Sequence, residues 1–99
     1  MEHTMQHAVN LLVQLGSLPK SNAATAQLLE KYESAFSEIK TPISDAEAYA
    51  LVRLFGPDDC FGLAWTLLHS IETAPSWLNE EALAGLSGDW IDLLRERAA

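Results

Sequence analysis

Cys60 and His69 are the two side chains in this sequence that most resemble an enzymatic nucleophile and its base. A cysteine thiolate beside an imidazole is a pair used in covalent catalysis. Their separation along the chain, however, turns the two side chains to opposite sides of a helix, because each residue advances the direction by about 100°. The spacing therefore excludes a dyad on one helix, and we expect His69 to be a packed, hydrogen-bonded core residue.

Two pairs of neighbouring carboxylates, Asp58-Asp59 and Glu80-Glu81, are the candidates for acid–base chemistry. Adjacent helical residues point about 100° apart, so neither pair forms a catalytic dyad by itself. We expect the two aspartates to cap a helix with Cys60 in its first turn, where they oppose the lowering of the cysteine pKa by the helix dipole. We expect the two glutamates to occupy the first turn of another helix.

His3 and His7 are spaced so that both imidazoles lie on one face of a helix, with Glu2 beside them. Such a set can hold a transition metal, but two histidines at a chain end bind weakly, and we expect a solvated first turn. The sequence also lacks a Gly-x-Ser-x-Gly elbow and a glycine-rich phosphate loop. We therefore predict a protein without enzymatic activity, cofactor or physiological metal.

The elements that carry these side chains are predicted to be helices, because apolar residues recur at helical spacing. Gly16 ends the first helix, and Ser17 is expected to cap the second, with Pro19 in its first turn. The sequence has no Asn-Gly or Asp-Gly hairpin turn and no sustained apolar–polar alternation, which argues against a sheet. We predict an all-α fold, a single helical domain over residues 1–99 that forms a compact irregular bundle of about five or six short helices.

Two later segments carry clear boundary signals. The stretch from Ser44 to Glu47 is a capping box, and the helix that it opens is expected to stop at Gly56-Pro57. The last helix, over residues 89–97, begins with acids and ends with arginines, which suits the helix dipole.

Residues 60–72 contain two side chains that readily carry charge near neutral pH, His69 and Glu72. A helix that is apolar or small nearly all the way round is an internal one, on which the other elements pack. We therefore predict a central apolar helix near residues 59–73, with Trp65 in the core.

Glu72 lies at the edge of the apolar arc of this helix, an arc that also includes Phe61. A buried carboxylate without a partner is costly, and Arg53 and Arg95 are its expected partners in a structural ion pair. The remaining side of the helix holds small side chains that let another helix backbone approach closely: Gly62, Thr66, Ser70 and Thr73.

The chain is strongly acidic, with 14 acidic and 6 basic residues and a formal net charge of −8. This charge repels phosphate backbones and anionic lipid, so we expect neither nucleic-acid nor membrane binding and favour a basic protein partner. No apolar run approaches the roughly 18 residues needed to span a bilayer. The first residues lack the pattern of a secretory signal, and the single cysteine forms no internal disulfide, so we expect a cytoplasmic protein.

Tryptophans beside acids are the candidate binding residues, since aromatic anchors rimmed by charge are typical of interface hot spots. Trp77 lies near Glu80 and Glu81, and Trp90 follows Asp89, so each is either a core edge or an interface anchor. The predicted partner-binding residues are Asp45, Glu47, Asp58, Asp59, Trp77, Glu80, Glu81 and Asp89, and further acids such as Glu30 and Glu33 would steer association. The predicted structural residues are Trp65, His69 and Glu72.

Small size, acidic charge and the lack of a catalytic motif favour a stoichiometric binding protein. The stretch from Leu54 to Trp77 and the closing Trp90-Ile91-Asp92-Leu93-Leu94-Arg95 resemble small acidic helical bacterial immunity-type proteins. The resemblance implies an immunity protein that neutralises a basic toxin or effector by occluding its active site.

Three other functions fit the same features. One is a scaffold or homo-oligomerisation domain of a larger bacterial assembly, in which apolar residues of the first and last helices form a homodimer. Another is a DNA-mimicking counter-defence inhibitor. The last is a small enzyme or metal protein that uses some of the residues His3, His7, Cys60 and His69.

Overall fold

Every regular element in the described part of the chain is helical. The structure is a computed structural model that describes residues 5–75 and 83–98. It confirms the predicted all-α bundle, because these ranges contain five α-helices and two short 3-10 helices and no strand. The α-helices are α1 (His7–Leu15), α2 (Ala26–Glu38), α3 (Asp45–Leu51), α4 (Leu63–Glu72) and α6 (Asp89–Ala98), and the 3-10 helices are Ser21–Ala23 and Val52–Leu54.

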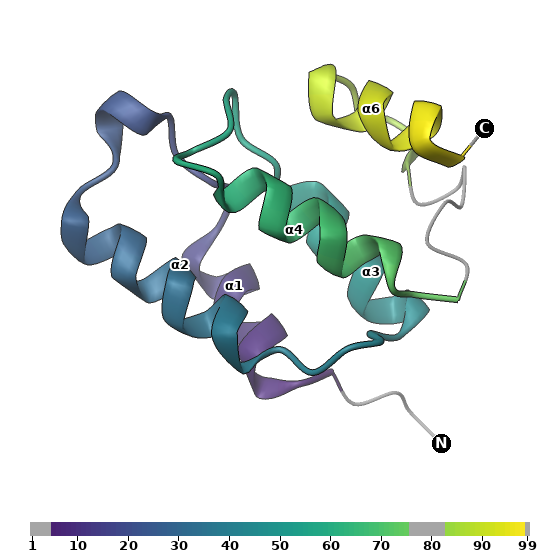
Figure 1. The fold of residues 1–99 in the computed structure, drawn as a ribbon, viewed down its shortest axis with the longest axis horizontal. Helices are drawn as coiled ribbons and strands as arrows, with labels where there is room; N and C mark the ends of the chain where they lie inside the picture. The colour runs from purple at the N-terminus through teal and green to yellow at the C-terminus, as the bar shows by residue number, and fades with distance from the viewer. Residues whose placement is uncertain (1–4, 76–82, 99) are drawn as a thin grey trace.

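Helix α4 crosses the middle of the molecule, with α2 on one side of it, α6 on the other, and α1 and α3 behind (Figure 1). It contacts both α2 and α3, and α1 packs against the same two helices. The core contains fully buried apolar side chains of these four helices, such as Val9, Leu12, Leu51, Leu67, Leu68 and Ile71, and it continues to the buried Ile91 and Leu94 of α6. These four helices leave one side of α4 exposed, and α6 contacts that side through Trp90.

The predicted capping box is confirmed at the start of α3. The Glu47 amide donates to the Ser44 hydroxyl oxygen at 3.1 Å, and the Ser44 amide donates to Glu47 Oε1 at 2.9 Å. Glu47 Oε2 also accepts a 2.7 Å hydrogen bond from the backbone N–H of Gln6, which lies just before α1. Glu47 is 4% exposed. Its buried carboxylate therefore links the residue before α1 to the first turn of α3.

Glu47 makes the fold sensitive to acid. Burial alone would raise the pKa of Glu47, but hydrogen bonds from Gln6 and Ser44 outweigh it and lower the pKa below the usual value of 4.5. The stability that the carboxylate adds is therefore complete above the pKa of the unfolded chain. It is lost as the pH falls through the lower pKa of the folded protein.

We expect Glu47→Gln to destabilise the protein by about 1–3 kcal/mol at neutral pH, because an amide NH₂ would then face a backbone N–H. The variant should also lose less further stability than the wild type as the pH falls below 4.5. Urea unfolding over a pH series measures both effects. Glu38→Gln, at an exposed position on α2, is the control and should keep the wild-type profile. An unchanged acid profile in Glu47→Gln would contradict this role.

The second helix begins later than the sequence predicts. Thr25 is its cap, with the hydroxyl oxygen accepting from the Leu28 amide at 3.1 Å, so the prediction of Ser17 as the cap is wrong. The reason is tertiary: the Leu18 side chain is buried, and its N–H donates to the carbonyl of Leu54 at 2.8 Å. This pairing holds the segment after Gly16 in a non-helical conformation.

The central helix also begins later, at Leu63 instead of near residue 59. Cys60 and Phe61 have φ values of 47° and 56°, and Gly62 has 90°, so residues 58–62 form a turn with a left-handed backbone. The Asp58 carboxylate accepts from the Cys60 amide at 3.0 Å and from the Ser21 amide at 3.1 Å. Asp58 therefore fastens this turn and does not cap α4.

Helix α4 is buried on one side and open on the other. Leu63, Ala64, Leu67, Leu68 and Ile71 are buried, whereas Thr66 is exposed on the opposite side. Trp65 is 42% exposed, and His69 is exposed as well. The predictions that Trp65 and His69 are core residues are therefore wrong, because the contact of Trp90 in α6 with Trp65 leaves both side chains exposed.

Glu72 forms an ion pair, as predicted, but with a different arginine. Its carboxylate accepts from the guanidinium of Arg97, with 2.9 Å between Arg97 Nη2 and Glu72 Oε1. Arg53 instead donates to the Tyr49 hydroxyl at 2.8 Å and lies over the Tyr49 ring. The pair is partly exposed and joins the end of α4 to the end of α6.

Candidate functional site

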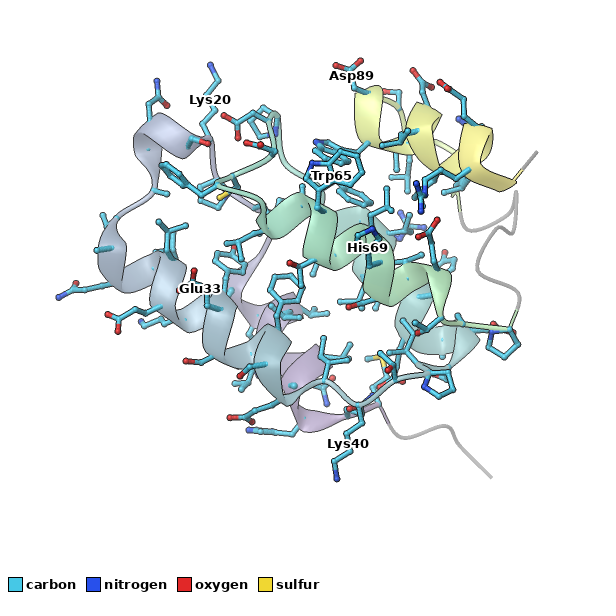
Figure 2. All side chains as sticks on the ribbon, in the orientation of Figure 1. Lys20, Glu33, Lys40, Trp65, His69 and Asp89 are labelled. Atoms are coloured by element: carbon cyan, nitrogen blue, oxygen red, sulfur yellow. The ribbon has the colours of Figure 1, made fainter. Side chains whose placement is uncertain are left out.

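The open side of α4 carries the most exposed large apolar side chain in the described part of the chain. Phe61 is 67% exposed in the turn before the helix, and Trp65 is 42% exposed in the first turn of the helix. Thr66 and His69 are exposed beside them, and Figure 2 shows Trp65 and His69 on the outer side of α4. We call the surface formed by Phe61, Trp65, Thr66 and His69 the α4 face.

Trp65 is held in place by other rings. Its indole meets Trp90 of α6 edge-on at 5.1 Å between ring centroids, and Trp90 in turn stacks on Phe55 at 5.6 Å. The His69 ring centroid lies 6.2 Å from that of Trp65. Trp90 is therefore a core edge that supports the exposed tryptophan, and a ring fixed in this way loses little further entropy when it binds.

Phe61 owes its exposure to the strained turn. A left-handed backbone costs about 1–2 kcal/mol for a residue with a side chain, and both Cys60 and Phe61 adopt it. Asp58 supports the turn, and the backbone N–H of Ser21 lowers the pKa of Asp58, with smaller contributions from the Cys60 N–H and the Lys20 charge. Such strain is common where a side chain is displayed for function.

Cys60 points the opposite way, into the core. It is fully buried, and burial raises its thiol pKa, with the charges of Asp58 and Asp59 raising it further. The thiol is therefore protonated at neutral pH. The predicted first-turn position, where a helix dipole lowers the pKa, is wrong because Cys60 precedes α4.

One hollow borders the α4 face directly, a second is lined by Trp90, which contacts Trp65, and each has an acidic residue in its lining. The first has a volume of about 350 Å³ between α2 and α4, and its walls include Phe61, Thr66 and Glu33. The second, of about 320 Å³, lies between Phe55 and the start of α6 and includes Trp90 and Asp89. Figure 2 labels Glu33 on α2 and Asp89 at the start of α6, on either side of Trp65. The face thus combines central aromatic rings with acids at its edges.

A third hollow, of about 890 Å³, is larger than these two and is an open groove between α1 and α2. Leu11, Leu15 and Ala35 form its apolar part, while Glu30, Lys31 and other polar residues line the rest. Its lining has no aromatic side chain and mixes both signs of charge. We therefore place the candidate site at the α4 face.

The structure divides the predicted partner-binding acids into different roles. Asp59 and Asp89 are exposed, as is Asp45 at the start of α3. Asp58 holds the turn, and Glu47 is buried. Glu47 therefore has no surface to offer a partner, and this part of the prediction is wrong. The predicted binding residues Trp77, Glu80 and Glu81 lie outside the described residues.

The candidate metal ligands are not brought together where the structure describes them. His7 is exposed at the start of α1, and His3 lies outside the described residues. Among the described residues no group of three or more histidine, cysteine or acidic side chains forms a metal-binding cluster. No helix in the same ranges is long and apolar enough to cross a membrane.

Sequence reasoning missed Phe61 as a surface anchor and assigned it to the apolar arc of the helix. Its neighbours Asp58, Asp59 and Gly62 are typical turn residues, and they are the one local signal for the bend that displays it. A scan against protein-family models gives no match to this chain, and searches of the curated proteins and of the solved structures give none either.

Proposed function

We propose that this chain is a non-enzymatic inhibitor of the immunity type, which binds a basic bacterial toxin or effector in the cytoplasm and occludes its active site. The observation that carries the proposal is the α4 face itself. Two large aromatic side chains are exposed there, Phe61 and Trp65. Phe61 lines a hollow with Glu33, and Trp65 contacts Trp90, which lines a hollow with Asp89.

The physical argument rests on the aromatic side chains at the centre of the face and the acidic side chains around them. Aromatic side chains that become fully buried at the centre of an interface supply most of its binding energy. Acids around them speed association with a basic partner and disfavour acidic ones. Trp65 is already fixed by Trp90, so the face resembles an inhibitor surface that needs little rearrangement.

A homo-oligomeric scaffold is the second candidate. Val13 on α1 is 43% exposed, and the α4 face is open, so apolar surface is available for a second copy. The net charge of −8 opposes this association, because both copies repel each other. The same charge would serve a DNA-mimicking inhibitor, whose target also has a basic surface.

Electrostatic steering gives a direct test with the partner encoded beside this chain or recovered from the native cell. We expect association to slow steeply as salt rises and Asp89→Lys to slow it several-fold, by roughly 1 kcal/mol in the association barrier. Glu38→Lys makes the same charge change on α2 outside the α4 face and should have a much smaller effect. Stopped-flow association rates at several salt concentrations provide the measurement. Tight binding that is insensitive to salt would exclude the electrostatic part of the proposal.

A further inference from the structure

We propose that the hollow between α2 and α4 is a socket for one arginine side chain of the partner. Its walls include Glu33, Ser37 and Phe36 from α2, and Phe61 and Thr66 from α4 and the turn before it. The inference rests on the proposed function and adds to it the chemistry of one contact. The volume of about 350 Å³ suits a single long side chain and not a folded element.

The polar atoms of the hollow favour a cation with several N–H donors. Glu33 supplies an exposed carboxylate, and the lining contains no basic side chain among the described residues. The Ser37 hydroxyl donates to the Ser34 carbonyl at 2.7 Å, so its oxygen is left to accept a hydrogen bond from a ligand. A guanidinium group offers five donors in a plane, which matches a carboxylate together with a hydroxyl acceptor.

The aromatic part of the hollow favours the same group. The Phe61 ring is 67% exposed on a turn that is strained by its left-handed backbone. Arginine stacks its planar cation on an aromatic face, and its aliphatic stem packs against apolar walls such as Phe36. A purely apolar side chain would instead bury the Glu33 carboxylate without a partner, and an acidic one would be repelled.

The test needs no knowledge of the partner. The ¹⁵N-labelled chain is titrated with N-acetyl-arginine-N-methylamide and, separately, with the citrulline analogue, which has the same shape and no charge. We expect amide shifts at Ser37, Phe61, Gly62 and Thr66, with binding at least about five-fold tighter for arginine than for citrulline.

Two variants locate the contact. Glu33→Gln should remove the preference for arginine, while Glu30→Gln, on the same helix outside this hollow, should keep it. Phe61→Asn should weaken binding by a similar factor without loss of stability, because asparagine tolerates the left-handed backbone at φ 56°. A melting curve verifies that each variant is folded.

Three results would each overturn the socket. They are amide shifts confined to other surfaces, equal binding of the arginine and citrulline analogues, and an unchanged preference of Glu33→Gln for the arginine analogue. The partner separates this failure from failure of the proposed function. If the partner loses affinity for Trp65→Ala and Phe61→Asn but binds Glu33→Gln as tightly as the wild type, the α4 face stands and the arginine socket is wrong.

Discussion

Replacing Gly56 with alanine is expected to destabilise the protein by about 3 kcal/mol or more, because the new methyl group overlaps with the backbone. A Cβ atom at Gly56 would lie 2.0 Å from the carbonyl oxygen of Leu18 and 2.8 Å from its carbonyl carbon. The Leu18 backbone is held in turn by its 2.8 Å hydrogen bond to Leu54. The clash is therefore relieved by breaking that bond or by moving the buried Leu18 side chain.

Urea unfolding of Gly56→Ala measures this effect, and Gly85→Ala is its matched control. Gly85 has a φ of 80° and open space where a Cβ would be. Its substitution should therefore lower the free energy of unfolding by about 1–2 kcal/mol, the cost of a left-handed backbone at alanine, with no added clash. Failure of Gly56→Ala to fold agrees with the prediction. A loss no larger than that of Gly85→Ala would show that the segment before α2 yields easily, contrary to the packing described above.

Trp65→Ala is expected to weaken partner binding by about 30-fold, or about 2 kcal/mol, as for other aromatic hot spots. The indole is the central large side chain of the α4 face, and the edge-on contact with Trp90 fixes it before binding. Val13→Ala is the control, because Val13 has a similar exposure of 43% on α1 and lies outside the face. Calorimetric titration with the partner gives both dissociation constants.

The same variant also loses its contact with Trp90, worth about 1 kcal/mol of stability, so a melting curve must accompany the binding measurement. Binding experiments well below the melting temperature compare folded proteins only. A stable Trp65→Ala variant with wild-type affinity would remove the α4 face from the interface, whereas an equal loss in Val13→Ala would point to a different surface.

The parts of the fold that the sequence predicts correctly are those determined locally. Helical periodicity identifies the all-α class, and the capping box from Ser44 to Glu47 lies where the pattern places it. The last helix has acids in its first turn and arginines in its last, as expected. Each of these features depends on residues within a few positions of one another.

The errors arise where distant segments decide the outcome. Ser17 is a good helix cap by type, but the pairing of Leu18 with Leu54 prevents a helix there. The sequence predicts that Glu47 is a surface acid, but its carboxylate is buried where the backbone N–H of the distant Gln6 donates to it. Arg53 and Arg95 are the partners of Glu72 that the sequence predicts, but in the folded chain α6 brings Arg97 to this carboxylate.

For the central helix, the sequence predicts more buried side chains than the structure shows. Its pattern of apolar and small side chains is the same for a helix enclosed by its own chain and for one that presents a face to a partner. The sequence pattern therefore predicts that Trp65 and Phe61 are buried, whereas both side chains are exposed in the structure. The turn at residues 58–62 could be anticipated from its aspartates and glycine, but its left-handed backbone at Phe61 could not.

The most direct test of the central claim, that the α4 face binds a basic protein, is photo-crosslinking in the cell that makes this chain. A photoreactive residue is placed at Thr66 on the α4 face and, as the control, at exposed Asn10 on α1. We predict that position 66 captures one protein with a net positive charge and that position 10 does not. When a lysate of the same cells is irradiated instead, we expect high salt to reduce the yield. Capture of a second copy of this chain at position 66, or equal capture of the same protein from both positions, would contradict the account.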